Sequence, residues 1–142
     1  MEALPALADL DIRIPSDVQY IADIVDQVVR RCAAAAFPRR HLALNVPVAL
    51  TEALSNAILR GNGDEASRSV HVRARVDATG LVLEVRDEGD GFDLELCTED
   101  PTTADNLVRE DGRGLFLMRS LMDEVERYSD GGNVVRLTLH RA

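Results

Sequence analysis

The chain has 142 residues, the length of a single domain, and 46% of them are hydrophobic, which is enough for one core without disulfides or structural metals. Its 16 Lys and Arg residues against 25 Asp and Glu residues give a net charge of −9, which argues against DNA or RNA as a partner. Because the N-terminal segment does not resemble a signal peptide and no long uncharged apolar run occurs, we expect a cytoplasmic protein that does not bind membranes.

The first part of the chain is predicted to form a strand and two helices. Apolar and polar residues alternate over 10–14, as in a half-buried strand. Ser16 is expected to cap a helix that runs from about residue 17 to 37, where apolar residues recur at helical spacing. A second helical pattern covers roughly residues 40–60, and Pro47 should either kink this helix or start it afresh at its first turn.

A strand pair should follow. Residues 61–64 contain two glycines and an asparagine, which tolerate the left-handed conformation that ends many helices. Strict alternation of apolar and polar residues then predicts strands at 70–77 and 81–86. A short turn at Gly80 would join them into an antiparallel hairpin with one covered and one solvated face.

The last part of the chain completes the predicted order. Residues 94–111 are polar and indicate a loop, Gly112 is expected to begin a third helix whose apolar face reaches Val125, and a last strand covers 134–140. The order strand, helix, helix, strand, strand, loop, helix, strand, strand lacks regular βαβ alternation. We therefore predict an α+β fold for residues 1–142 as one domain, a two-layer α/β sandwich with a mixed, mostly antiparallel sheet and helices on one face.

Three short elements carry residues suited to chemistry. Glu52 and Asn56 lie four residues apart, on one face of the second helix and at the edge of its apolar stripe, although a helical Glu is most often simply solvated. Asp87 begins a segment with glycines at alternate positions, where the backbone can turn sharply and approach a ligand, although such segments are also common plain turns. Gly112-Arg113-Gly114 opens a helix, whose free amide groups and dipole favour an anion.

In their order and on these elements, the three segments resemble the N, G1 and G2 boxes of the ATP-binding superfamily shared by gyrase, the heat-shock chaperone of the same class, sensor histidine kinases and MutL. The matching segments are TEALSNAILRGN (51–62), DEGDGF (87–92) and GRGLFLMRSLMDEV (112–125). Within the superfamily the chain most resembles the anti-sigma-factor serine/threonine kinases. The resemblance implies the Bergerat-type ATP-binding fold, with ATP and Mg²⁺ as cofactors.

The resemblance also implies a role for each matching polar residue. Asn56 would coordinate the Mg²⁺ that bridges the phosphates, a task suited to an amide oxygen. Glu52, one helical turn earlier, would act as general base or would orient the attacking hydroxyl. Arg60 would present a cation to the phosphates, and Asp87 would accept a hydrogen bond from the adenine amino group.

The glycine-rich segments would contact the base and the phosphates. By the same resemblance, Gly89 and Gly91 would let the base lie against the chain. The phosphates would be bound by four residues at the start of the third helix: Gly112, Arg113, Gly114 and Leu115. Two features depart from the family: the last strand begins with Asn133 where many members have Thr, and the segment before the third helix is short and acidic.

These implications lead to one functional hypothesis and its competitors. The resemblance implies an anti-sigma factor that phosphorylates a Ser or Thr of a STAS-domain anti-anti-sigma protein and binds a sigma factor in exchange. It also implies a homodimer, and the edge strand predicted at 10–14 is a candidate for its interface. The alternative is a catalytically weak nucleotide-sensing module that regulates a signalling partner. A histidine kinase fragment is disfavoured because the first helix contains no histidine, and a purely structural protein would not need glycines at both mouths of one pocket.

Overall fold

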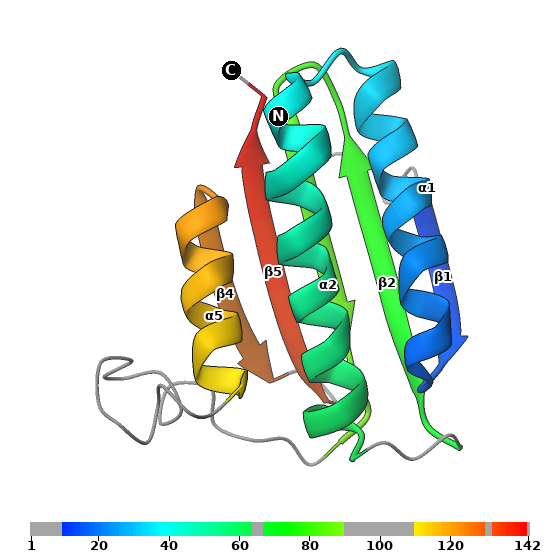
Figure 1. Cartoon of the computed structure of the whole chain (residues 1–142). Coiled ribbons are helices and arrows are strands. Elements are labelled where there is room, and N and C mark those ends of the chain that lie inside the picture. Colours follow the sequence, from blue (N-terminus) through cyan, green and yellow to red (C-terminus); the bar gives the residue numbers. More distant parts are fainter. Residues whose placement is uncertain (1–9, 64–66, 90–109, 130–131, 142) are drawn as a thin grey trace.

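The computed structural model of the chain describes residues 10–63, 67–89, 110–129 and 132–141. In these ranges, helices α1, α2 and α5 lie in one layer over one face of a five-stranded sheet (Figure 1). The other face of the sheet carries no helix in the part of the chain that is described. The predicted α+β class and its two-layer arrangement are therefore confirmed.

The sheet has the strand order β1-β2-β3-β5-β4, with β1 and β4 at its edges. Its strands are β1 Leu10–Pro15, β2 Ser69–Val76, β3 Gly80–Arg86, β4 Glu124–Ser129 and β5 Asn133–His140. Each neighbouring pair is antiparallel, so the described sheet is wholly antiparallel rather than mixed. The reason is that β3 and β4 run in the same direction but are separated by β5, which returns between them and is antiparallel to both.

Three stretches of helix form the covering layer. They are η1 Val18–Tyr20 with α1 Ile21–Ala34; η2 His41–Asn45, α2 Val46–Asn56 and η3 Ala57–Gly61 in one continuous run; and α5 Glu110–Leu121. Pro47 lies in the first turn of α2, as the second of the two alternatives has it, and the hydrogen-bond pattern changes from the π-helical η2 to α2 next to this proline while the helical run continues. α2 lies between α1 and α5 and contacts both (Figure 1).

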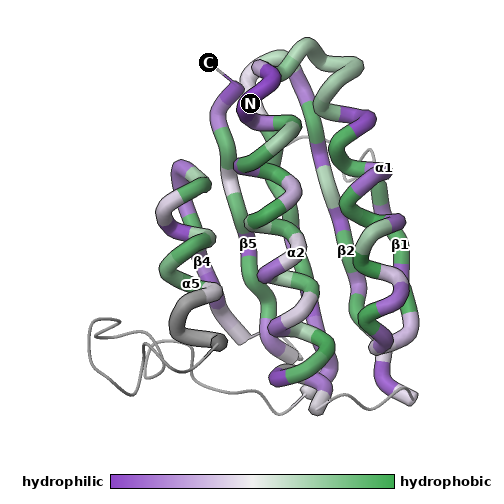
Figure 2. The backbone as a smooth tube through the Cα atoms, in the orientation of Figure 1, coloured by the Kyte–Doolittle hydropathy of each residue, from purple (hydrophilic) through white to green (hydrophobic). Residues whose placement is uncertain are grey.

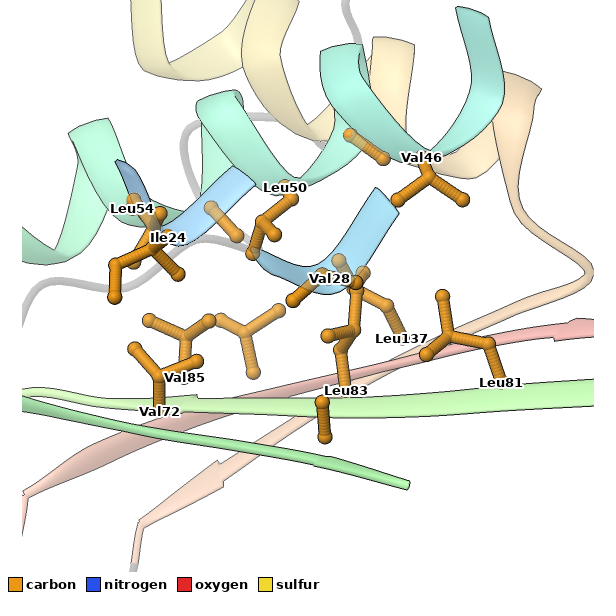
Figure 3. Packing of buried hydrophobic residues seen from close by; sticks show 14 of the residues in the cluster. Ile24, Val28, Val46, Leu50, Leu54, Val72, Leu81, Leu83, Val85 and Leu137 are labelled. Carbon is orange, nitrogen blue, oxygen red and sulfur yellow. The ribbon is translucent and has the colours of Figure 1, made fainter. Parts of the chain in front are cut away.

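The core lies between the two layers. Hydrophobic residues alternate with hydrophilic ones along β2, β3 and β5 and recur at helical spacing along α1 and α2, so that each of these elements has one apolar side (Figure 2). Leu50 and Leu54 of α2 meet Val72, Leu83 and Val85 of the sheet in the centre of this core (Figure 3). All five are fully or almost fully buried.

The solvated face of the sheet carries a row of alternating charges that crosses all five strands. Asp11, Arg73, Glu84, Arg136 and Glu126 stand directly opposite one another in the register of the sheet. The closest ion pair joins Arg136 to Glu84 at 2.7 Å, and the other neighbours are 3.6 to 3.8 Å apart. Arg73 is therefore part of a solvated sheet face, as its alternating sequence pattern suggests, rather than part of a free basic patch.

The structure corrects two predicted boundaries. Ser16 does not cap the first helix: its side chain is buried and donates to the carbonyl of Ile58, while Asp17 caps η1 by accepting from the Gln19 N–H. The third helix begins at Glu110 rather than Gly112 and ends at Leu121 rather than near Val125. The Asp123 N–H donates to the Thr138 carbonyl, which turns the chain into β4.

Within the described residues, one helical stretch, His41–Arg60, is long and apolar enough to span a membrane by length and composition, with a mean hydropathy of 1.4. It is the central helix of the covering layer and contributes Leu50, Leu54 and Ile58 to the core. Its apolar character is thus explained by packing against the sheet.

Candidate functional site

The buried carboxylate of Asp87 lies immediately after β3. The side chain is 3% exposed. It accepts hydrogen bonds from the Gly89 N–H at 2.9 Å, and from both the backbone N–H and the side-chain amide of Asn133 at 3.3 Å. Burial raises the pKa of Asp87, and these hydrogen bonds oppose that rise only in part. The structure thus holds a desolvated acceptor at the end of the sheet.

A glycine directly before the neighbouring strand β5 allows this arrangement. Gly132 has φ +148°, which side chains rarely adopt, and a Cβ atom at this position would collide with the carbonyl oxygen of Asp87. Asp87 in turn donates its N–H to the carbonyl of Asn133 at 3.0 Å. The residue that follows β3 and the residues that begin β5 are therefore locked together.

A second group of polar residues lies where α2 packs against α5. Gly114 approaches α2 so closely that an added Cβ atom would lie 2.7 Å from Oε1 of Glu52 and 3.3 Å from Nδ2 of Asn56. Glu52 and Asn56 therefore face the backbone of α5 from one side of α2, as their spacing predicts. A side chain at position 114 would compete directly with the Glu52 carboxylate for space.

Asn56 carries a buried polar atom without a partner. The residue is 7% exposed, and its Nδ2 has no hydrogen-bond partner among the described residues. A buried unpaired amide is costly to stability, and a ligand can complete the bonding of such a group. Because the two ends of an amide can exchange by rotation, this side chain can offer either N–H or oxygen to a ligand.

Both groups lie at the same end of the molecule. The C-terminal part of α2, the start of α5 and the start of β5 lie toward the lower end of the view in Figure 1, and β3, which is antiparallel to β5, ends there too. The sequence elements that suggest nucleotide chemistry are thus brought together, although they lie far apart in the chain.

A model of the family described as Histidine kinase-like ATPase domain matches residues 14–139. The chain belongs to this family. Among its relatives, the serine-protein kinase RsbW of Bacillus velezensis is 30% identical over 91% of this chain and 83% of its own length. RsbW of Bacillus subtilis is 26% identical over the same shares of the two chains. These relatives confirm the resemblance to anti-sigma-factor kinases.

A solved structure agrees on the fold of this histidine kinase-like ATPase domain. The RsbU and RsbW domains of Rv1364c from Mycobacterium tuberculosis match 93% of this chain with a TM-score of 0.63 and 18% identity. The chain spans 32% of that longer protein. At this level of identity, the comparison concerns the fold alone.

Other predicted site residues of the ATPase domain are placed less centrally. Gly112 and Arg113 fall within the first turn of α5, whose first four N–H groups lack helical partners. Arg60 lies in η3, one turn beyond Asn56, and its side chain is exposed. Leu115 is fully buried, and its side chain belongs to the hydrophobic core. Gly91 and most of the predicted 94–111 loop lie outside the described residues.

Asn56 is the described residue that a magnesium–nucleotide complex could use as a ligand. In the described parts of the chain, no cluster of three or more His, Cys, Asp or Glu side chains could hold a metal by itself. Magnesium in phosphoryl-transfer sites is held through one or two protein oxygens together with phosphates and water. The amide oxygen of Asn56 is one protein oxygen of this kind, and the unpaired amide nitrogen is able to donate to a phosphate oxygen or to water.

Two asparagines at this site are not predicted by sequence reasoning. The sequence marks Asn133 only as a departure from the family's Thr, yet its side chain and its backbone N–H donate to Asp87. The sequence pattern places Asn62 at the end of a helix, yet its side chain is 1% exposed and bonded to the Glu88 N–H. Nothing in the local pattern marks these roles, because both depend on segments distant in sequence.

Proposed function

We propose that the protein is an ATP-dependent serine/threonine kinase that acts as an anti-sigma factor in the cytoplasm. Its substrate is a STAS-domain anti-anti-sigma protein, and a sigma factor is its alternative partner. The observation that carries the proposal is the close approach of Gly114 to Glu52 and Asn56, since it places a carboxylate and an unpaired amide at the start of a helix. The RsbW relatives, which are named serine-protein kinases, support the same activity.

The nucleotide takes a defined orientation in this proposal. The buried Asp87 carboxylate accepts from the adenine amino group, and Gly89 and Gly91 lie along the base. The phosphates bind at the start of α5, where Gly112 and Arg113 lie in the first turn and Gly114 follows them. Arg60 adds positive charge near the phosphates, and Asn56 offers its amide oxygen to Mg²⁺, which would neutralise charge on the phosphates.

Glu52 acts on the nucleophile. The substrate hydroxyl oxygen forms a bond to the γ-phosphorus while the bond between that phosphorus and the bridging oxygen of ADP breaks, and the hydroxyl proton passes to the Glu52 carboxylate. ADP and a phosphoserine or phosphothreonine leave. Phosphoryl transfer needs mainly positioning and charge stabilisation, and the contact between α2 and α5 provides both.

Phosphorylation then works as a switch between partners. The unphosphorylated STAS-domain protein occupies the kinase and leaves the sigma factor active. The added phosphate carries close to two negative charges and disfavours binding to a chain of net charge −9, so the phosphorylated partner dissociates and the sigma factor is captured. A homodimer is part of the proposal, and β1, which lies at a sheet edge, is available for its interface.

The test replaces Glu52 with glutamine. Transfer of labelled phosphate from ATP to the STAS-domain proteins of the source organism should fall roughly 10²- to 10⁴-fold in Glu52→Gln, because general base catalysis contributes about that factor. MgATP affinity should remain within about threefold of wild type. The matched control is Glu126→Gln on the solvated sheet face, which should leave both quantities unchanged.

Two results would contradict the kinase assignment. If wild type binds MgATP but transfers no phosphate to any STAS-domain protein, the protein is a nucleotide-sensing module that regulates a signalling partner. If Glu52→Gln transfers phosphate as fast as wild type, the carboxylate is not the base.

A further inference from the structure

Asn62 joins three separate segments of the chain. Its side-chain amide nitrogen donates to the carbonyl of Ser69 at 3.0 Å and to the hydroxyl of Ser16 at 3.3 Å. Its amide oxygen accepts from the Glu88 N–H at 2.7 Å. The residue is 1% exposed, so these bonds replace contacts with water in a buried place. Asn62 thus links the end of the long helix to three other segments: the residue after β1, the start of β2 and the segment after β3.

The backbone of Asn62 does not explain why asparagine stands here. Asparagine is often selected after a helix because it tolerates a positive φ, and the sequence pattern predicts that role. The structure gives Asn62 φ −91° and ψ −3°, within the right-handed region that any residue adopts, and places the positive φ at Gly63. The requirement for asparagine therefore comes from its side-chain hydrogen bonds.

The bond to Glu88 acts on Asp87. The Glu88 N–H belongs to the peptide unit that joins Asp87 to Glu88, so Asn62 fixes the orientation of that unit. The carbonyl oxygen of the same unit lies directly against Gly132, and the Asp87 N–H donates to Asn133. The backbone is thus held on both sides of the Asp87 Cα atom, which sets the direction of the carboxylate.

We propose that Asn62 is a positioning residue of the nucleotide site, whose amide holds the Asp87–Glu88 peptide so that the Asp87 carboxylate points at the adenine amino group. This inference rests on the proposed function, because it assumes that Asp87 binds adenine. Hydrogen bonds that fix an acceptor before the ligand arrives reduce the ordering that binding requires. Asn62 therefore contributes to base recognition without touching the base.

The experiment compares two nucleotides that differ only in the amino group. Affinity is measured for MgATP and for the magnesium complex of purine riboside triphosphate, which lacks the adenine amino group, in wild type and in Asn62→Ala. Losing a bond to a buried donor weakens the interactions that depend on it, so ATP affinity should fall about tenfold. Affinity for the analogue should change by less than about twofold, because the analogue makes no hydrogen bond to Asp87.

Two further variants provide the control and the rescue. Ser16→Ala removes one buried hydrogen bond of Asn62 but leaves its bond to the Glu88 N–H. This variant should therefore bind ATP in preference to the analogue as strongly as wild type does. Asn62→Asp retains an acceptor for the Glu88 N–H and should also keep this preference. In an Asp87→Asn background, Asn62→Ala should cause no further loss of ATP affinity, since its effect acts through that carboxylate.

Several outcomes would overturn the inference. An equal loss of affinity for both nucleotides in Asn62→Ala assigns the residue to general stability of the fold. Loss of the ATP preference in Asn62→Asp, or failure of both Asn62 variants to fold, leads to the same assignment. If wild type itself binds no ATP, the proposed function is wrong. The wild-type measurement alone gives this result, so it is distinguishable from a failure of the inference, which appears only in the Asn62 variants.

Discussion

At the scale of single residues, the described part of the chain buries few polar side chains, and they gather at one end of the fold. They are Ser16, Asn56, Asn62 and Asp87. Burying a polar group costs free energy unless the group is hydrogen-bonded, so the presence of these four polar side chains in the interior requires a reason. The Asn62 side chain bonds to the Ser16 hydroxyl and to the N–H of Glu88, the residue after Asp87. Asn56 instead keeps an unpaired amide nitrogen, as expected of a group that meets a ligand.

The absence of a side chain at position 114 matters for activity more than for stability. In Gly114→Ala the new methyl group would displace the end of the Glu52 side chain, which is flexible, so the fold should survive with a change in unfolding free energy within about 1 kcal/mol. Displacing the base by about an ångström should slow ATP turnover roughly 10²-fold. Urea unfolding and turnover assays test this, with Ser120→Ala on α5 as the control. Normal turnover in Gly114→Ala would contradict the proposed role of Glu52.

The raised pKa of Asp87 predicts a pH-dependent difference between wild type and Asp87→Asn. Since burial raises the pKa above 3.8, the folded state binds the proton more tightly, and this contribution to stability is present at low pH and lost as pH rises through the folded pKa. Asparagine does not titrate. In the absence of nucleotide, the stability of Asp87→Asn relative to wild type should therefore increase between about pH 3 and about pH 7.

Asp77→Asn provides a control of opposite sign. The hydroxyl of Thr79, and then the backbone N–H groups of Thr79 and Gly80, hold the pKa of Asp77 below its usual value. Its contribution to stability is present above the unfolded pKa and lost as pH falls. The stability of this variant relative to wild type should thus decrease as pH rises, and denaturant titrations across the acid range measure both trends. A flat difference for Asp87→Asn would show that its carboxylate is not desolvated.

At the scale of elements, the row of charges across the sheet shows how the face without helices is kept stable in water. Glu84 stands at its centre, between Arg73 and Arg136, and its hydrogen bond raises the pKa of Arg136. Opposite charges placed directly across strands stabilise a sheet, and alternating signs avoid repulsion between neighbours. The row also leaves this face charged, which disfavours unspecific stacking of one sheet on another.

Replacing the central carboxylate tests this interpretation. Glu84→Gln should lower the unfolding free energy by about 1 kcal/mol, because the side chain is mostly buried and bonded to Arg136 through two nitrogens. The loss should shrink at high salt, where ion pairs between partly exposed groups are screened. Glu126→Gln, at the exposed end of the same row, is the control and should change stability by less than about 0.5 kcal/mol. Equal losses in the two variants would contradict a special role for Glu84.

At the scale of the whole molecule, the candidate site is assembled from both layers. α2 and α5 bring Glu52, Asn56 and Gly114 together, and the sheet brings Asp87 to Asn133. A nucleotide bound across this end would contact elements from both layers at once. Binding should therefore stabilise the fold as a whole rather than one loop.

This predicts a thermal shift with MgATP. A ligand at about 100 times its dissociation constant stabilises the folded state by about 2.7 kcal/mol, which for a domain of this size raises Tm by roughly 5 to 10 °C. Asn56→Ala and Asp87→Asn should reduce the shift at the same MgATP concentration, because each removes a direct contact. Asp26→Asn, on the exposed side of α1, should retain it. No shift in wild type at millimolar MgATP would contradict nucleotide binding.

The sequence by itself determined the fold class, most of the helices and strands, and the three motif segments. Alternation marked β2 and β3, and helical spacing marked α1 and α2, because these elements bury one side against the core and the pattern is local. The bounds of β4 could not be predicted: it is an edge strand in which only Val125 and Arg127 are half-buried, so it has almost no apolar pattern. The early start of α5 had a signal in Glu110 and Asp111, since acids favour the first turn of a helix.

Only the tertiary structure decided how the site is held. The position of β5 between β3 and β4 places Asn133 on Asp87, and this follows from the path of the whole sheet. The roles of Ser16 and Asn62 depend on partners 46 and 26 residues away, and no local pattern predicts such partners. Motif spacing selects residue types that are able to do chemistry, but buried hydrogen bonds between distant segments fix where those groups point.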